Sequence, residues 1–222
     1  IVAAGNNANV LHYVENKDEV LDGQLVLIDA GCEFGGVTGG YAGDITRTFP
    51  ANGKFTEAQR EVYQLVLDSQ LAALKLARPG ECLIELHRAV ERVLRRGLVK
   101  LGILPASASR RKAKVPGDKS LGLKDLYMHG TSHWLGIDVH DVGNYDPEGL
   151  GSKKRVLEPG MVFTIEPGLY LNSNDKRIPA KYRGIGVRIE DDVLITEGGH
   201  EVLTAGVPKS VEGIEALMAA RV

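Results

Sequence analysis

The stretch Gly160-Met161-Val162-Phe163-Thr164-Ile165-Glu166 has the same design as an earlier one, Gly23-Gln24-Leu25-Val26-Leu27-Ile28-Asp29. Each begins with a turn glycine and ends, six residues later, on a carboxylate that follows an apolar run typical of a β-strand. Each is followed further along the chain by a second carboxylate within a strand, Asp44 in the first case and Glu190 in the second. We interpret this as an internal duplication, in which a pseudo-two-fold axis would bring the four acidic groups together. The alternative is chance similarity between apolar strands that end in acidic turns.

Further strands are expected around these two. Asp29 is predicted to close the strand that begins at Leu25. The glycine-rich stretch 35–40 has the composition of a flexible hairpin tip that leads into a second strand, but a plain loop is the favoured interpretation. Strands are also predicted at 10–14, 44–49, 162–166, 187–190 and 193–196.

Three helices are expected as well. Thr56-Glu57-Ala58-Gln59 fits a capping box, and apolar residues follow it at helical spacing until Pro79-Gly80. An apolar stripe predicts a second helix over 83–101, with Gly102 as its stop. A last short helix is predicted at about 210–220. The stretch 105–120 is rich in Arg and Lys and poor in large apolar residues, which predicts an exposed loop, with phosphate binding as an alternative.

The composition is that of an ordinary globular protein, with 222 residues, 43% hydrophobic residues and a net charge of −2. This charge gives no overall attraction to nucleic acid or to an anionic membrane. No apolar run approaches the roughly 18 to 20 residues needed to cross a bilayer, and the start lacks the basic region of a signal peptide. We therefore expect a cytoplasmic protein that binds neither nucleic acid nor membranes. Cys32 and Cys82 are expected to be reduced. Because the sequence begins with Ile1 and not with Met, we do not expect Ile1 to be the natural N-terminus.

Three of the six histidines lie within twelve residues: His129, His133 and His140. A single histidine is usually structural, but three together with glycines, in a chain that also offers four strand-associated carboxylates, are typical of a metal site. A donor set rich in carboxylates and without thiolates favours Mn²⁺, with Co²⁺ and Zn²⁺ as competitors. Two such ions would balance the charge of four carboxylates. The sequence therefore predicts a site for two divalent metal ions.

Five strings of this chain resemble the catalytic domain of the aminopeptidase P family. They are Asp29-Ala30-Gly31, Ala42-Gly43-Asp44-Ile45-Thr46-Arg47-Thr48-Phe49-Pro50, residues 129–143, Ile165-Glu166-Pro167-Gly168-Leu169-Tyr170 and residues 182–192. The resemblance covers nearly the whole chain. It implies an α+β pita-bread fold with pseudo-two-fold duplicated halves. It also implies that residues 1–222 form a catalytic metallopeptidase domain that lacks its N-terminal start, without the family's separate N-terminal domain.

The resemblance also implies the metal ligands. By motif position, Asp29 chelates one ion, His133 and Glu166 bind the other, and Asp44 and Glu190 bridge both. This division agrees with the chemistry of the side chains, because a bridge needs two oxygen atoms and a neutral imidazole has one lone pair.

Other residues match positions around the metal site. His12, His129 and His140 are expected to contact the substrate or take part in catalysis, with structural packing as the alternative. Tyr170 and Arg188 match a hydrogen-bond network, although Arg188 could simply orient a neighbouring carboxylate. Glu166 is expected to relay a proton to the leaving nitrogen, while His129 or His140 stabilises the oxyanion.

The function implied is metal-dependent hydrolysis of the N-terminal Xaa-Pro bond of peptides with proline in second place. Because that proline nitrogen carries no hydrogen, the enzyme must accept the ring in a shaped pocket, for which Tyr170, Trp134 and His140 are candidate walls that could equally be core. A related Xaa-Pro dipeptidase would share all five ligands. A methionine aminopeptidase would share the ligand types, but the string from His133 to His140 argues against it. A pita-bread binding module without metal chemistry also stays open, as does assembly into a homo-oligomer.

Overall fold

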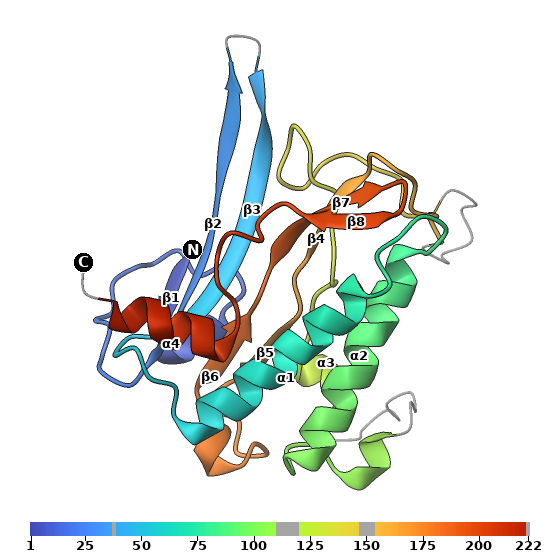
Figure 1. Ribbon diagram of the computed structural model, residues 1–222. Helices are drawn as coiled ribbons and strands as arrows, with labels where there is room; N and C mark the ends of the chain where they lie inside the picture. The colour runs from blue at the N-terminus through green and yellow to red at the C-terminus, as the bar shows by residue number, and fades with distance from the viewer. Residues whose placement is uncertain (37–38, 110–119, 147–153, 221–222) are drawn as a thin grey trace.

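A long antiparallel hairpin dominates the first half of the computed structural model, which describes residues 1–36, 39–109, 120–146 and 154–220. Its strands are β2 (Leu25–Gly36) and β3 (Gly39–Pro50), paired from Leu25 opposite Pro50 to Gly36 opposite Gly39. β1 (Val2–Ala4) pairs with the base of β2. The far end of the hairpin projects from the rest of the molecule (Figure 1).

The second half contains two further antiparallel sheets. β4 (Val162–Ile165) pairs with β7 (Asp191–Thr196), which in turn pairs with β8 (Gly199–Val202). β5 (Gly168–Leu171) pairs with β6 (Ile185–Arg188). An isolated β-bridge between Thr46 and Glu190 links β3 to this half.

Helices cover these strands. α1 (Glu57–Leu74) packs on the sheets of the second half, and α2 (Leu83–Lys100) lies beside α1, while α4 (Val211–Ala219) lies near the base of the hairpin (Figure 1). The remaining helical segments are short: η1 (Gly5–Asn9), η2 (Ala106–Ser109), α3 (Leu123–Leu126) and η3 (Ala180–Tyr182). Among the described residues, no helix combines the length and apolar character needed to cross a bilayer.

The main core lies between the helix pair and the strands. Val62 and Val66 of α1, Leu86 of α2, and Phe163 and Val187 of the sheets are all fully buried within it. The capping box predicted at the start of α1 is present, because Gln59 N donates to Thr56 Oγ1 and Thr56 N donates to Gln59 Oε1. The mixture of packed helices and antiparallel sheets confirms the predicted α+β class.

The strand predicted at 10–14 is wrong. Val10 and Val14 are exposed and the segment turns after η1, since β1 already occupies the edge of β2. The prediction that Asp29 closes its strand is also wrong, because β2 continues through Asp29 to Gly36.

The glycine-rich stretch extends the hairpin rather than forming a plain loop. Gly35 pairs with Gly40 and Gly36 with Gly39, while residues 37 and 38 lie outside the described part. A Cβ at Gly35 would lie 2.1 Å from the Cα of Gly40, so this close approach of the strands requires glycine. Most of the predicted loop at 105–120 also lies outside the described residues, apart from η2 and its neighbours. Cys32 and Cys82 are both free thiols, as expected.

Candidate metal centre

A cavity of about 240 Å³ lies where the hairpin meets the second half of the fold. All five predicted ligands line it, together with His12, His129, His140 and Arg188. The ligands are Asp29, Asp44, His133, Glu166 and Glu190. Residues that are widely separated in the sequence therefore share one cavity.

The strand register explains how the two aspartates meet. Gly31 is opposite Asp44 in the hairpin ladder, and Asp29 is opposite Thr46. Side chains of paired residues, and of residues two apart on one strand, point to the same face of a sheet. Asp29 and Asp44 therefore share the face that lines the cavity.

Strand pairing also brings the two glutamates, Glu166 and Glu190, together. Ile165 at the end of β4 is opposite Asp191 at the start of β7, so Glu166 and Glu190 extend from neighbouring strand ends. Glu190 N donates to Thr46 O at 3.1 Å, which holds this strand pair against the hairpin. Each half of the fold thus supplies two carboxylates from one antiparallel strand pair.

His133 lies at the middle of the acidic group. Its Nε2 is 3.5 Å from Asp44 Oδ2, 3.6 Å from Glu166 Oε1 and 3.9 Å from Glu190 Oε1. Its Nδ1 lies 3.0 Å from the carbonyl oxygen of Trp134, so Nδ1 carries the proton in the neutral ring. The lone pair of Nε2 is then directed to the carboxylates, as a metal-binding histidine requires. Asp44, His133 and Glu190 each offer a ligand atom within 4.8 Å of the others.

The charges of this group are poorly balanced without cations. Burial, together with the charges of Glu166 and Asp44, raises the pKa of Glu190 well above its ordinary value. Burial also raises the pKa of Glu166 to about 7, although His133 and Arg188 oppose this shift. Burial alone would lower the pKa of His133, but its contact with Asp44 and its bond to the carbonyl of Trp134 raise it. Oxygen donors with such mutual repulsion fit divalent cations, which would replace protons as the source of positive charge.

Asp29 has a different partner from the other carboxylates. Arg188 Nη2 donates to Asp29 Oδ2 at 2.5 Å, and Arg188 Nη1 donates to the hydroxyl oxygen of Tyr170 at 3.0 Å. Arg188 reaches Glu190 only indirectly, because its Nε donates to Thr46 Oγ1 at 3.3 Å and Thr46 donates to Glu190 Oε2 at 2.6 Å. Arg188 thus orients Asp29 directly rather than the neighbouring Glu190.

The three other predicted histidines differ in their surroundings. His129 is held on both sides, since its Nδ1 lies 2.7 Å from Gly130 O and its Nε2 lies 2.8 Å from the Tyr170 hydroxyl. Burial, with the charge of Arg188, lowers the pKa of His129 to about 4, so its ring is neutral near pH 7. His140 is exposed and its ring contacts that of His133, with centroids 4.4 Å apart. His12 is also exposed, after η1, at the wall of the cavity.

Two of the three predicted walls of a proline pocket are not at the cavity surface. Trp134 is buried and stacks on Tyr145, with Phe163 at its edge, so it belongs to the core. Tyr170 is also buried and lies behind Arg188 and His129. Of the three, His140 lines the cavity.

Some residues at the site were missed by sequence reasoning. One is Thr46, whose hydroxyl donates to Glu190. Another is Asp192, which is 5% exposed and accepts a hydrogen bond from Asp44 N at 3.0 Å. A signal was available in the run Glu190-Asp191-Asp192, because consecutive acidic residues within an apolar strand must find buried partners.

Comparisons with known proteins agree with this geometry. Residues 1–197 match the model of metallopeptidase family M24. The chain is 54% identical over 220 residues to the Xaa-Pro aminopeptidase of Escherichia coli, a match that covers 99% of this chain and 46% of that protein. It is 51% identical to the Xaa-Pro aminopeptidase of Haemophilus influenzae, over 98% of this chain and 47% of the relative.

Solved structures give the same result. A variant of E. coli aminopeptidase P in complex with substrate matches with a TM-score of 0.84 and 53% identity, over 98% of this chain and 46% of that one. Aminopeptidase PepP of Pseudomonas aeruginosa matches with a TM-score of 0.84 and 50% identity, over 99% of this chain and 47% of that one. The chain thus spans about half the length of these relatives.

Proposed function

Because this chain belongs to metallopeptidase family M24 and has the α+β pita-bread fold, we propose that it is a metal-dependent aminopeptidase that hydrolyses the N-terminal Xaa-Pro bond of peptides. The observation that carries the proposal is the convergence of four carboxylates and His133 in one cavity, three of those carboxylates within 3.9 Å of His133 Nε2, in a chain whose relatives are named Xaa-Pro aminopeptidases. Residues 1–222 are the catalytic domain in this proposal, and the enzyme acts on peptides in the cytoplasm.

The metal ligands in this proposal are Asp29, Asp44, His133, Glu166 and Glu190. Asp44 and Glu190 would be shared by two ions, Asp29 would hold one of them, and His133 with Glu166 would hold the other. The oxygen-rich donor set favours Mn²⁺ over Co²⁺ and Zn²⁺. When bound, divalent cations polarise a peptide carbonyl and lower the pKa of a water molecule, which supplies a nucleophile near neutral pH.

Glu166 is the proton carrier in this proposal. Its carboxylate lines the cavity and lies 3.8 Å from His129 Nδ1. A carboxylate in this place can accept a proton from the attacking water and release it to the leaving proline nitrogen.

The non-ligand histidines contact the substrate. Tyr170 and Arg188 fix His129 in a neutral form beside Glu166, with 3.8 Å between His129 Nδ1 and Glu166 Oε2. His12 and His140 reach the same cavity from two exposed segments. These positions support a role in binding the peptide and in stabilising the charge that develops on its carbonyl oxygen.

A peptide-length assay tests the function. The purified protein, supplied with Mn²⁺, is incubated with Xaa-Pro-Zaa tripeptides, with Xaa-Pro dipeptides and with Xaa-Ala-Zaa control peptides, and the release of free Xaa is measured. We expect release from the Xaa-Pro-Zaa peptides and no release after chelation. Release from dipeptides alone would show a dipeptidase, and equal release from the alanine peptides would show that proline is not selected. No bound metal and no release from any peptide would favour a binding module.

A further inference from the structure

We propose that Gln70 of α1 is a positioning residue that sets the spacing between the two glutamates of the metal centre. This inference rests on the proposed metal-dependent function. Gln70 is fully buried and is not among the residues that line the cavity, so it can act only through other residues.

The side-chain amide of Gln70 contacts the backbone of two separate segments. Its Nε2 lies 3.1 Å from Ile165 O and 3.3 Å from Ile189 O. These carbonyls immediately precede Glu166 and Glu190 in the chain. One side-chain amide therefore links the two backbone segments that carry the glutamates.

Neighbouring charges fix the orientation of this amide. Lys209 Nζ donates to Gln70 Oε1 at 2.9 Å and also to Asp191 Oδ2. Gln70 Nε2 in turn donates to Asp191 Oδ2 at 3.0 Å. Since Lys209 offers only donors, it holds the amide oxygen on its own side and directs the amide nitrogen to the carbonyls.

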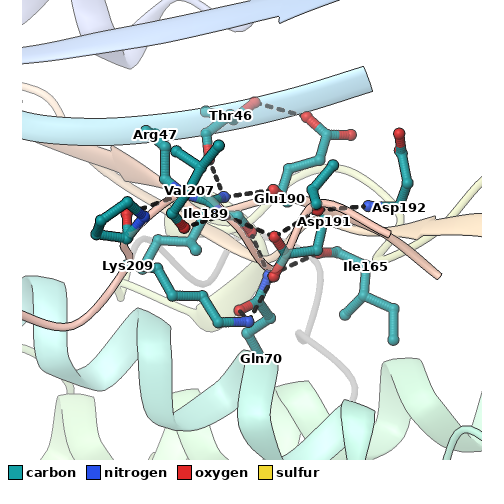
Figure 2. Close-up of polar contacts among 12 residues, drawn as sticks. Thr46, Arg47, Gln70, Ile165, Ile189, Glu190, Asp191, Asp192, Val207 and Lys209 are labelled. Atoms are coloured by element: carbon teal, nitrogen blue, oxygen red, sulfur yellow. Dashed lines mark hydrogen bonds and ion pairs between the residues drawn. The ribbon is translucent and has the colours of Figure 1, made fainter. Parts of the chain in front are cut away.

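Gln70, Lys209 and Asp191 form a buried polar cluster that is also bonded to the hairpin. Asp191 is fully buried, and its Oδ1 accepts from Arg47 Nη2 at 2.7 Å. Arg47 Nη1 donates to Glu190 O at 2.6 Å and to Thr46 O at 3.0 Å (Figure 2). A helix, the hairpin and both glutamate segments are thus tied to one buried polar cluster, which fixes how far apart the two glutamates stand.

The substitution Gln70→Met tests the proposal, because Met has a similar length but removes the amide donor that the two carbonyls share. Gln64→Met is the matched control, since Gln64 is on the exposed face of the same helix and donates to Asp68. Binding of Mn²⁺ to the metal-free proteins is measured by calorimetry, well below the unfolding temperature of each. We expect Gln70→Met to weaken Mn²⁺ binding about 10- to 100-fold, as loss of a residue that orients ligands does, and Gln64→Met to leave it unchanged.

The outcomes separate this inference from its premise. If Gln70→Met unfolds more easily but binds Mn²⁺ as tightly as the native protein, Gln70 is structural and the inference is wrong. If the native protein binds no Mn²⁺, the proposed function fails and the inference with it. Should Gln70→Met not fold, Lys209→Met decides, because Lys209 is only half-buried and its loss frees the amide to rotate. We then expect a several-fold weaker Mn²⁺ binding that Lys209→Arg restores, and unchanged binding in Lys209→Met would overturn the proposal.

Discussion

The two ring nitrogens of His133 have different partners. Nδ1 is committed to the carbonyl oxygen of Trp134, and Nε2 faces three carboxylates. In the metal-free state, the raised pKa of this ring favours a proton on Nε2, where it would offset part of the negative charge of the carboxylates. A metal ion at this position would displace that proton, so metal binding and proton release are coupled.

Asp44 is the single residue whose loss should be most damaging. It is 8% exposed and contacts His133, and its proposed role is to bridge both ions. We expect Asp44→Asn to abolish metal occupancy and peptidase activity, because an amide offers one oxygen and no charge to the two ions. Elemental analysis and the tripeptide assay measure both effects, with Asp68→Asn as an exposed control. Retained turnover in Asp44→Asn would show that this aspartate does not bridge.

The acidic group also predicts a pH dependence of the metal-free protein. The pKa of Glu166 rises from 4.5 to about 7 on folding, so its stabilising contribution is complete below about pH 4.5 and is lost as the pH rises through 7. The lowered pKa of His129 acts in the opposite direction, but only below its ordinary value of 6.5. We therefore expect the melting temperature of the chelator-treated protein to fall between about pH 6.5 and 8.

The variant Glu166→Gln, which resembles the protonated carboxyl, is the control for this pH effect. It should show a smaller fall in melting temperature over the same range. A melting temperature that stays constant or rises between about pH 6.5 and 8 in the native metal-free protein would contradict the assignment to Glu166.

At the scale of elements, local signals were predictable and non-local pairings were not. The capping box at Thr56 and the apolar stripe of α2 are encoded within a few residues, and both helices begin where they are predicted, although α1 ends at Leu74, before the predicted stop at Pro79-Gly80. The extent of β2 depends instead on its partner strand, so the carboxylate of Asp29 did not mark a strand end. The segment at 10–14 has a strand-like composition but no free strand edge to join.

The packing of β6 on η1 gives a prediction at this scale. A Cβ at Gly186 would lie 2.6 Å from the backbone carbonyl atoms of Ala8, which cannot move aside as a flexible side chain could. We expect Gly186→Ala to destabilise the fold by about 1 to 3 kcal/mol, a lowering of the melting temperature by roughly 2 to 12 °C, measured by calorimetry. Gly198→Ala is the control, because a Cβ there meets no atom within 4 Å. Equal melting temperatures for the two variants would show that η1 is free to shift.

At the scale of the whole molecule, the residues that share the cavity could be predicted but the polar cluster behind them could not. The predicted ligands stand in recognisable strings, and all five line one cavity. Gln70 is 95 residues from Ile165 and 119 from Ile189, and no local pattern relates them. A partial signal was the position of Gln70 four residues after the buried Val66, where a core-facing helix normally has an apolar residue.

Because each half of the fold supplies two of the carboxylates, metal binding should stabilise the chain as a unit. A ligand that binds only the folded state stabilises it by about 2.7 kcal/mol at a hundred times its dissociation constant. For a chain of 222 residues this corresponds to a rise in melting temperature of roughly 5 to 11 °C for each ion bound. We expect Mn²⁺ to give such a rise in the native protein and a much smaller one in Asp44→Asn, whose site is incomplete. A melting temperature that does not respond to Mn²⁺ would mean that the two halves do not close on a common metal centre.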